Sequence, residues 1–302
     1  MAGGQERVLR RRIRSIESTK KITRAMELIA ASRIIRAQQR VAAARPYARY
    51  LTEVLHNLAA AGGNVSASPL LQAPNDQLPV GFIVVAADRG LAGGYNANVL
   101  RAAERAIEEE RRAGRDYRLI VSGRKAENYF RFKRYRLDAT FHGFSDQPNY
   151  EDARAIAREV LARFESGEVG RVDLVYTQFL SVGSQRVVNR RFIPVPVETL
   201  TERPDEGPKA GYEFEPTPET ILARLLPSYV EARLFDALLE AAASEHAARQ
   251  RAMKSATDNA STLITNLTRV MNRARQESIT TEIMEIVGGA EALAGESTAS
   301  ED

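Results

Sequence analysis

A glycine-rich turn at residues 88–96 is the first segment whose residue types and spacing suggest chemistry. It reads Asp-Arg-Gly-Leu-Ala-Gly-Gly-Tyr-Asn and directly follows an apolar run at 80–87. Such a turn between a strand and a helix can bind a pyrophosphate. The dinucleotide motif is Gly-x-Gly-x-x-Gly, however, and these glycines are spaced Gly-x-x-Gly-Gly. Two interpretations stay open: a tight structural turn, which we favour, and an NADP site with Arg124 and Lys125 near the phosphate.

Few other residues are arranged for catalysis. Asp88 could act as a lone acid, but an acceptor for turn amides is the better interpretation at a strand end. His246 could titrate near neutral pH, and we expect it to be a surface or interface histidine. The sequence contains no Gly-x-Ser-x-Gly elbow, and no histidine has a serine or carboxylate at a suitable spacing. We therefore expect no catalytic site.

Composition argues against a metal site, against thiol chemistry and against a transmembrane helix. The 302 residues include no Cys and only three His, so we expect neither a metal site nor a disulfide. Since we favour a structural role for the glycine-rich turn, we also expect no cofactor. No apolar run approaches the roughly 20 residues that would cross a bilayer. The basic N-terminal stretch also lacks the apolar segment of a secretory signal.

The charge distribution is the strongest compositional signal. Residues 1–50 hold 13 Lys and Arg against 3 Asp and Glu, whereas the remainder holds 30 against 36. A segment this basic favours an acidic partner, which could be nucleic acid, an anionic membrane surface or a protein. No aromatic residue precedes Tyr47. We therefore favour a protein partner or a solvated helix face over nucleic acid.

A long helix must position these basic residues, and we predict it over residues 1–61. Good helix formers dominate from about Gln5 to Ala60, and Pro46 is expected to leave a kink. Apolar or small residues recur at alternating spacings of three and four, which is typical of a helix packed lengthwise on another. The positions are Leu9, Ile13 and Ile16, then Met26, Ala30, Ile34, Ala37, Val41, Ala44, Ala48, Leu51, Leu55 and Leu58.

The middle of the chain changes its period. Strand and helix patterns alternate over residues 76–200, which predicts an α/β domain with a mainly parallel sheet. The expected strands are 80–87, 117–121, 136–141, 172–180 and 187–197, and the expected helices end near 113, 132 and 165. The last two strands are expected to form a hairpin, giving the sheet an antiparallel edge.

A second long helix is predicted over residues 217–290, after an acidic linker at 201–216 and with a bend at Pro227. Its stripe positions include Ile221, Leu225, Ala232, Phe235, Leu239, Ala242, Leu263, Leu267, Val270 and Ala274, and an apolar face continues at Ile279, Ile283 and Ile286. Residues 291–302 are predicted to be a disordered tail. The expected fold class is α/β plus a long coiled coil: terminal helices paired antiparallel, with a central Rossmann-like α/β domain.

Several segments resemble the gamma subunit of F-type ATP synthases. Residues 279–290, ITTEIMEIVGGA, match that family's signature I/V-T-x-E-x-x-D/E-x-x-x-G-A at every fixed position. Further resemblances lie at 15–32, 88–96, 244–249 and 272–276. The resemblance runs in order from about Gln5 to Leu293, so it covers nearly the whole chain.

The resemblance implies the central-stalk rotor of a proton-translocating ATP synthase. Such a subunit transmits torque between the membrane c-ring and the catalytic alpha3beta3 hexamer, and regulates ATPase activity and proton flow. It has no catalytic site of its own. The implied partners are the alpha, beta and epsilon subunits and the c-ring, with one copy per complex. The implied place is peripheral, on the cytoplasmic face of a bacterial cell membrane, with no bilayer insertion and no nucleic acid.

Contact residues follow from the resemblance only where the motifs match. They are Lys20, Lys21, Arg24 and Met26 on the first long helix, and Arg249, Arg275, Gln276, Thr280 and Glu282 on the last. Each also has an ordinary interpretation as a surface or helix-seam residue. Some relatives carry a Cys-bearing insert that switches activity by redox state, and the absence of Cys excludes that switch here.

Overall fold

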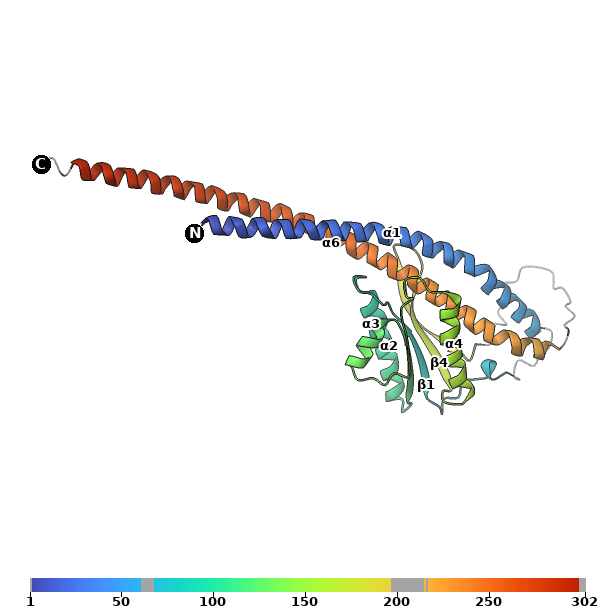
Figure 1. The fold of residues 1–302 in the computed structure, drawn as a ribbon. Coiled ribbons are helices and arrows are strands. Elements are labelled where there is room, and N and C mark those ends of the chain that lie inside the picture. Colours follow the sequence, from blue (N-terminus) through green and yellow to red (C-terminus); the bar gives the residue numbers. More distant parts are fainter. Residues whose placement is uncertain (1, 61–67, 197–214, 216, 299–302) are drawn as a thin grey trace. The chain divides into compact units, whose positions relative to one another are not determined.

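The computed structural model describes residues 2–60, 68–196, 215 and 217–298 (Figure 1). The chain forms two compact units: unit 1 comprises residues 1–28 and 252–302, and unit 2 comprises residues 29–251. The elements in chain order are α1 (Ala2–Ala60), η2 (Pro69–Leu71), β1 (Val80–Val85), α2 (Tyr95–Arg112), β2 (Tyr117–Ser122), α3 (Arg124–Phe132), β3 (Ala139–Phe141), α4 (Tyr150–Glu165), β4 (Arg171–Phe179), β5 (Gln185–Ile193) and α6 (Pro218–Thr298).

Unit 2 is built on a five-stranded sheet with the order β3-β2-β1-β4-β5. The first four strands are parallel, and β4 pairs antiparallel with β5. The parallel part follows the 3-2-1-4 order of a doubly wound fold, and β5 is added as a hairpin at the β4 edge. The predicted mainly parallel sheet with an antiparallel edge is confirmed. Strand β5 ends at Ile193, earlier than expected, because Pro194 and Pro196 lack the N–H that a ladder needs.

Both faces of the sheet are covered, which explains why β1 is apolar throughout. Phe82 and Val84 point into one core with α2 and α3, whereas Ile83 and Val85 point into another with α4. The second core also contains residues from both long helices, and all six residues of β1 are buried. A continuous apolar run is the pattern expected of a parallel strand with helices on both sides.

Parts of both long helices pack on the α4 side of the sheet within unit 2. Leu51, Leu55 and Leu58 of α1 lie in the same cluster as Leu222 and Leu226 of α6. The predicted α1 stripe is therefore confirmed here, and every one of its residues from Ala30 to Leu58 is buried or half-buried. Pro46 and Pro227 lie inside continuous helices and end neither of them.

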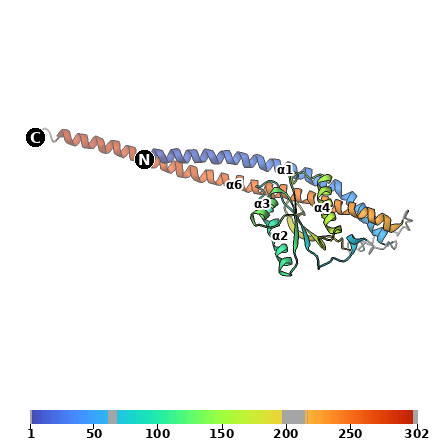
Figure 2. The same ribbon diagram turned by 60° about the horizontal axis from the view of Figure 1, so that its bottom comes forward.

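Unit 1 is a pair of helical segments that run in opposite directions (Figures 1 and 2). A repeat of buried or half-buried positions at spacings of four and three marks the seam side of α6: Met253, Thr257, Ala260, Ile264, Leu267, Met271 and Ala274. The predicted stripe is wrong at Leu263 and Val270, which are 51% and 49% exposed. Each lies one residue, or about 100° of helix, before an apolar residue that takes the seam position instead.

The end of α6 also differs from expectation. The helix continues to Thr298, whereas we expected disorder from residue 291. Residues 291–294 are Glu-Ala-Leu-Ala, which are good helix formers and extend the helix. The predicted linker at 201–216 lies outside the described residues except for Glu215, as do residues 299–302. The domain limits 1–61, 76–200 and 217–290 remain predictions, and both compact units contain parts of both long helices.

Candidate interaction surface

The last part of α6 carries a dense group of exposed apolar side chains. Figures 1 and 2 show α6 continuing beyond the start of α1 within unit 1. Every side chain from residue 281 to residue 290 is exposed. The large apolar members of this end are Ile279, Ile283, Met284, Ile286 and Val287, and their exposed fractions run from 46% to 71%. An apolar patch of this kind on a folded protein marks an interaction site.

The candidates on α1 lie in unit 1 and combine charge with partial burial. Lys21 and Arg24 are exposed, whereas Lys20 and Met26 are half-buried. The Arg24 guanidinium donates to both carboxylate oxygens of Glu27 at 2.9 Å. Glu27 itself occupies the seam, with 8% of its surface exposed. Arg24 is thus held by its own helix but keeps 58% of its side chain accessible to a partner.

Four of the five candidates on α6 are also free to meet a partner. Arg275, Gln276, Thr280 and Glu282 are all exposed. The Thr280 hydroxyl donates to the Gln276 carbonyl at 3.0 Å, and the Glu282 carboxylate accepts from Ser278 at 3.4 Å. These local bonds orient the side chains along the helix without removing them from solvent.

Arg249 differs from the other eight candidates, because unit 2 encloses it. Only 8% of its surface is exposed. Its guanidinium lies 2.6 Å from the Glu245 carboxylate and donates to the Gly90 carbonyl at 3.3 Å. Burial raises the pKa of Glu245, and the nearby Arg249 opposes that rise. The structure thus gives Arg249 internal partners, and its surface is too small for a large contact.

His246 is buried, which corrects the expectation of a surface or interface residue. It has 1% exposure, and its Nε2 donates to the Asp146 carbonyl at 3.1 Å. Burial lowers the pKa of His246 below its usual value, so the ring is neutral at pH 7. A neutral ring with Nε2–H leaves Nδ1 as an acceptor facing Arg249.

The glycine-rich turn uses its polar groups internally. The Asp88 carboxylate accepts from the backbone amides of Arg124, Gly143 and Ser145 at 2.8 to 3.1 Å. Asp88 is therefore the turn-amide acceptor that we favoured. Leu91 and Gly93 have positive φ values of 62° and 56°, as a tight turn requires. The Asp88 carboxylate also places a negative charge at this end of the sheet, which disfavours a phosphate there, so the geometry favours the structural interpretation over the NADP site.

The sequence did not reveal the polar residues in the seam of unit 1. The hydroxyls of Thr23 and Thr257 lie 2.8 Å apart, and Thr257 has 8% exposure. Thr23 falls on the same three-four repeat as Ile13 and Ile16, so the repeat could have located it. A polar pair inside an apolar seam fixes the register of two helices.

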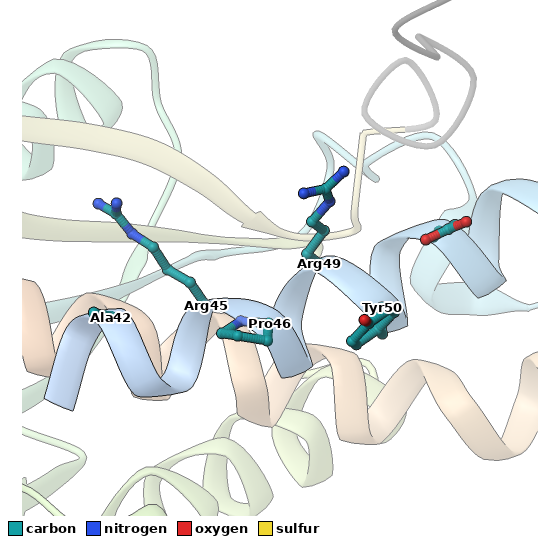
Figure 3. A pocket seen from close by; sticks show the side chains of 6 residues that line it. Ala42, Arg45, Pro46, Arg49 and Tyr50 are labelled. Carbon is teal, nitrogen blue, oxygen red and sulfur yellow. The ribbon is translucent and has the colours of Figure 1, made fainter. Parts of the chain in front are cut away.

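One hollow lies on the outer face of α1 in unit 2. It has a volume of about 670 Å³, and its lining residues are Ala42, Arg45, Pro46, Arg49, Tyr50 and Glu53. Figure 3 shows the Arg45 and Arg49 side chains extending from the same side of the helix. All of the lining comes from one exposed helix face, so the hollow supplies no converging set of groups for a small ligand.

The described residues contain neither a candidate metal site nor a candidate membrane span. They contain no group of three His, Asp or Glu side chains that could hold a metal ion. Within the same residues, no helix combines the length and the apolar character needed to cross a membrane.

Comparisons with known proteins point to one family. Residues 5–293 match a protein family described as ATP synthase. The ATP synthase gamma chain of Parafrankia sp. (strain EAN1pec) is 50% identical over 295 residues, covering 96% of this chain and 98% of that protein.

Two solved structures from Euglena gracilis share the fold. One is the rotor of the mitochondrial ATP synthase in rotational state 1, with a TM-score of 0.64, 17% identity, and coverage of 92% of this chain and 99% of that one. The other is a chain of the OSCP/F1/c-ring assembly in rotational state 3, with a TM-score of 0.66, 19% identity, and coverage of 96% and 95%.

Proposed function

This chain belongs to the ATP synthase gamma chain family, and we propose that it is the central-stalk rotor of a proton-translocating ATP synthase. The observation that carries the proposal is 50% identity to a gamma chain over nearly the full length of both proteins. In this role the chain transmits torque between the membrane c-ring and the catalytic alpha3beta3 hexamer. It also regulates ATPase activity and proton flow.

The proposed rotor has no catalytic site of its own. Asp88, His246 and Arg249 are the residues with the greatest potential for chemistry, and each is bonded to internal groups. ATP synthesis and hydrolysis are therefore assigned to the beta subunits. The chain contributes by imposing a different conformation on each beta subunit as it turns.

The proposed partners are the alpha and beta subunits, the epsilon subunit and the c-ring, with one chain per complex. The exposed apolar end of α6 supports its insertion into the ring of alpha and beta subunits, because an exposed apolar helix face is stabilised when a partner covers it. The proposed location is peripheral, on the cytoplasmic face of the bacterial cell membrane. The chain attaches there through the c-ring and does not enter the bilayer.

Eight residues are proposed to contact the hexamer: Lys20, Lys21, Arg24, Met26, Arg275, Gln276, Thr280 and Glu282. Six of them, all except the half-buried Lys20 and Met26, present exposed charged or polar groups that can form charge-assisted hydrogen bonds with partner loops. A rotating element shifts a partner only through contacts that differ between angles. These contacts are therefore expected to form and break as each beta subunit is passed.

Reconstitution tests this proposal. The purified chain alone should hydrolyse no ATP. When it is mixed with alpha and beta subunits from the same source, it should form a complex with one copy of this chain and an ATPase activity that depends on it. Failure to bind the alpha–beta hexamer, or ATP hydrolysis by the isolated chain, would contradict the proposal.

A further inference from the structure

The loop at residues 143–149 joins β3 to α4 and is fixed to the sheet by Asp88. One carboxylate oxygen of Asp88 accepts from the amides of Gly143 at 2.8 Å and Ser145 at 3.1 Å, and the other accepts from Arg124 at 3.0 Å. The Asp88 amide donates to the Ser145 hydroxyl at 2.9 Å. Burial opposes ionisation of Asp88, but these amides hold its pKa below the ordinary value.

Both long helices hold the same loop. From α1, Arg33 pairs with the Asp146 carboxylate at 2.6 Å, and Arg40 donates to the Pro148 carbonyl. From α6, His246 donates to the Asp146 carbonyl at 3.1 Å. Asp146 is therefore bonded to α1 through its side-chain carboxylate and to α6 through its backbone carbonyl. All of these groups lie in unit 2.

The neighbouring turns of α6 bind three further parts of the sheet domain. The Ser244 hydroxyl donates to the Thr177 carbonyl of β4 at 3.1 Å, and Arg251 donates to the Val182 carbonyl of the β4–β5 turn at 2.6 Å. Arg249 reaches the Gly90 carbonyl of the turn after β1. These bonds occupy the last two turns of α6 before it leaves unit 2 at residue 251.

Polar contacts of this kind restrain the rotation of a helix about its own axis, which apolar packing restrains less strongly. Hydrophobic burial has no preferred direction, so it tolerates some rotation of a helix about its own axis. Hydrogen bonds and paired charges require short distances and aligned donors. A helix held by several of them at different angles keeps one rotational position relative to the sheet.

We propose that Asp88 is a positioning residue that holds the loop at 143–149 as a joint through which torque passes between the sheet domain and both long helices. This inference rests on the proposed rotor function and deepens it. The joint transmits rotation because the loop is bonded to both long helices, through Arg33 and Arg40 of α1 and His246 of α6. The loop keeps its shape because the Asp88 carboxylate accepts its backbone amides.

The test compares Asp88→Ala with the matched control Asp138→Ala. Asp138 also accepts a backbone amide, from Leu119 at 2.8 Å, and its side chain is 10% exposed. Its charged partners are Arg118 of β2, Arg136 before β3 and Arg163 of α4, so among the described residues it contacts neither α1 nor α6. A third variant, Arg33→Ala, breaks the joint from the helix side and leaves the Asp88 bonds intact, so it guards against a folding defect in Asp88→Ala.

Two measurements are made on each variant. The first is hydrogen exchange of the full chain, in which Asp88→Ala should speed exchange at 143–149 and Asp138→Ala should not. The second is ATP-driven proton pumping by the complete complex in vesicles, divided by its rate of ATP hydrolysis. Asp88→Ala and Arg33→Ala should lower this ratio by about threefold, whereas Asp138→Ala should leave it unchanged.

The outcomes separate this inference from the proposed function. If Asp88→Ala only reduces the amount of assembled complex and the pumping ratio stays at the wild-type value, the joint carries no torque and the inference is wrong. The same conclusion follows if Asp138→Ala lowers the ratio equally. If the wild-type chain forms no complex, the rotor function itself is wrong, and the torque assignment fails with it.

Discussion

Unit 2 and unit 1 use apolar residues in opposite ways. Unit 2 buries them on both faces of a sheet, where Phe82, Ile83 and Leu119 have at most 1% exposure. Unit 1 is a two-helix pair whose seam includes Thr23, Glu27 and Thr257, and it leaves Ile283 and Ile286 more than half exposed. The difference indicates that unit 2 holds most of the folding free energy, whereas unit 1 keeps apolar surface for a partner.

The largest expected effect is the loss of a core side chain in unit 2. Phe82→Ala should lower the free energy of unfolding by about 3–5 kcal/mol, because it removes buried contacts and leaves a cavity. Leu263→Ala is the matched change in unit 1, where the side chain is 51% exposed and the loss should stay below about 1 kcal/mol. Urea denaturation of the free chain measures both, and equal losses would contradict the comparison.

Glu240 gives unit 2 a pH-dependent stability. Burial is the main cause, with help from the neighbouring Asp236, and it raises the pKa of Glu240 to about 7. A pKa above that of the unfolded chain means that stability is full at low pH and is lost as pH rises through about 7.

Glu240→Gln mimics the protonated side chain and should remove this loss. The variant should match the wild type near pH 5 and exceed it by about 2–3 kcal/mol at pH 9. Urea unfolding at the two pH values provides the measurement. A constant difference between the proteins from pH 5 to pH 9 would show that Glu240 does not titrate in this range.

The Thr23–Thr257 pair should show a smaller, coupled effect in unit 1. Each single change to Val removes one partner of a 2.8 Å contact and should lower the stability of the helix pair, whereas the double change should recover part of the loss. We expect a coupling free energy of about 1 kcal/mol from a double-mutant cycle followed by helical circular dichroism. Purely additive losses would mean that the contact does not set the register.

The smallest effect on folding is expected at the exposed end of α6. Ile283→Gln with Ile286→Gln should change the free energy of unfolding by less than about 0.5 kcal/mol, because both side chains already face solvent. The same pair of changes should weaken binding to the alpha–beta hexamer, measured by titrating the chain onto hexamer that is immobilised on a surface. Unchanged binding would show that this apolar end is not the contact surface.

Local patterns predicted much of the fold, because helices and strands record their environment in their periodicity. The three-four spacing from Ala30 to Leu58 located the packed side of α1, and the apolar run at 80–87 located a strand buried on both faces. On α6 the pattern was ambiguous, because Leu263 and Ile264 are adjacent and both apolar. Only the position of the partner helix decides which of them enters the seam.

The site was predicted less completely, because its bonds join distant parts of the sequence. The turn chemistry of Asp88 was predictable, but its partners Gly143 and Ser145 lie on a loop more than fifty residues away. His246 and Arg249 carry charge or can carry it, which favours a surface position in the sequence. Their burial depends on partner groups at Asp146, Glu245 and Gly90, which the fold alone brings together.

Direct observation of rotation tests the rotor assignment most directly. The chain contains no Cys, so Ala155→Cys on the exposed side of α4 provides a single attachment point for a visible probe. The alpha–beta hexamer is fixed to a surface, and ATP is added to the assembled complex. The rotor assignment predicts continuous rotation of the probe in one direction that stops when ATP is removed. A complex that hydrolyses ATP while the probe stays still would contradict it.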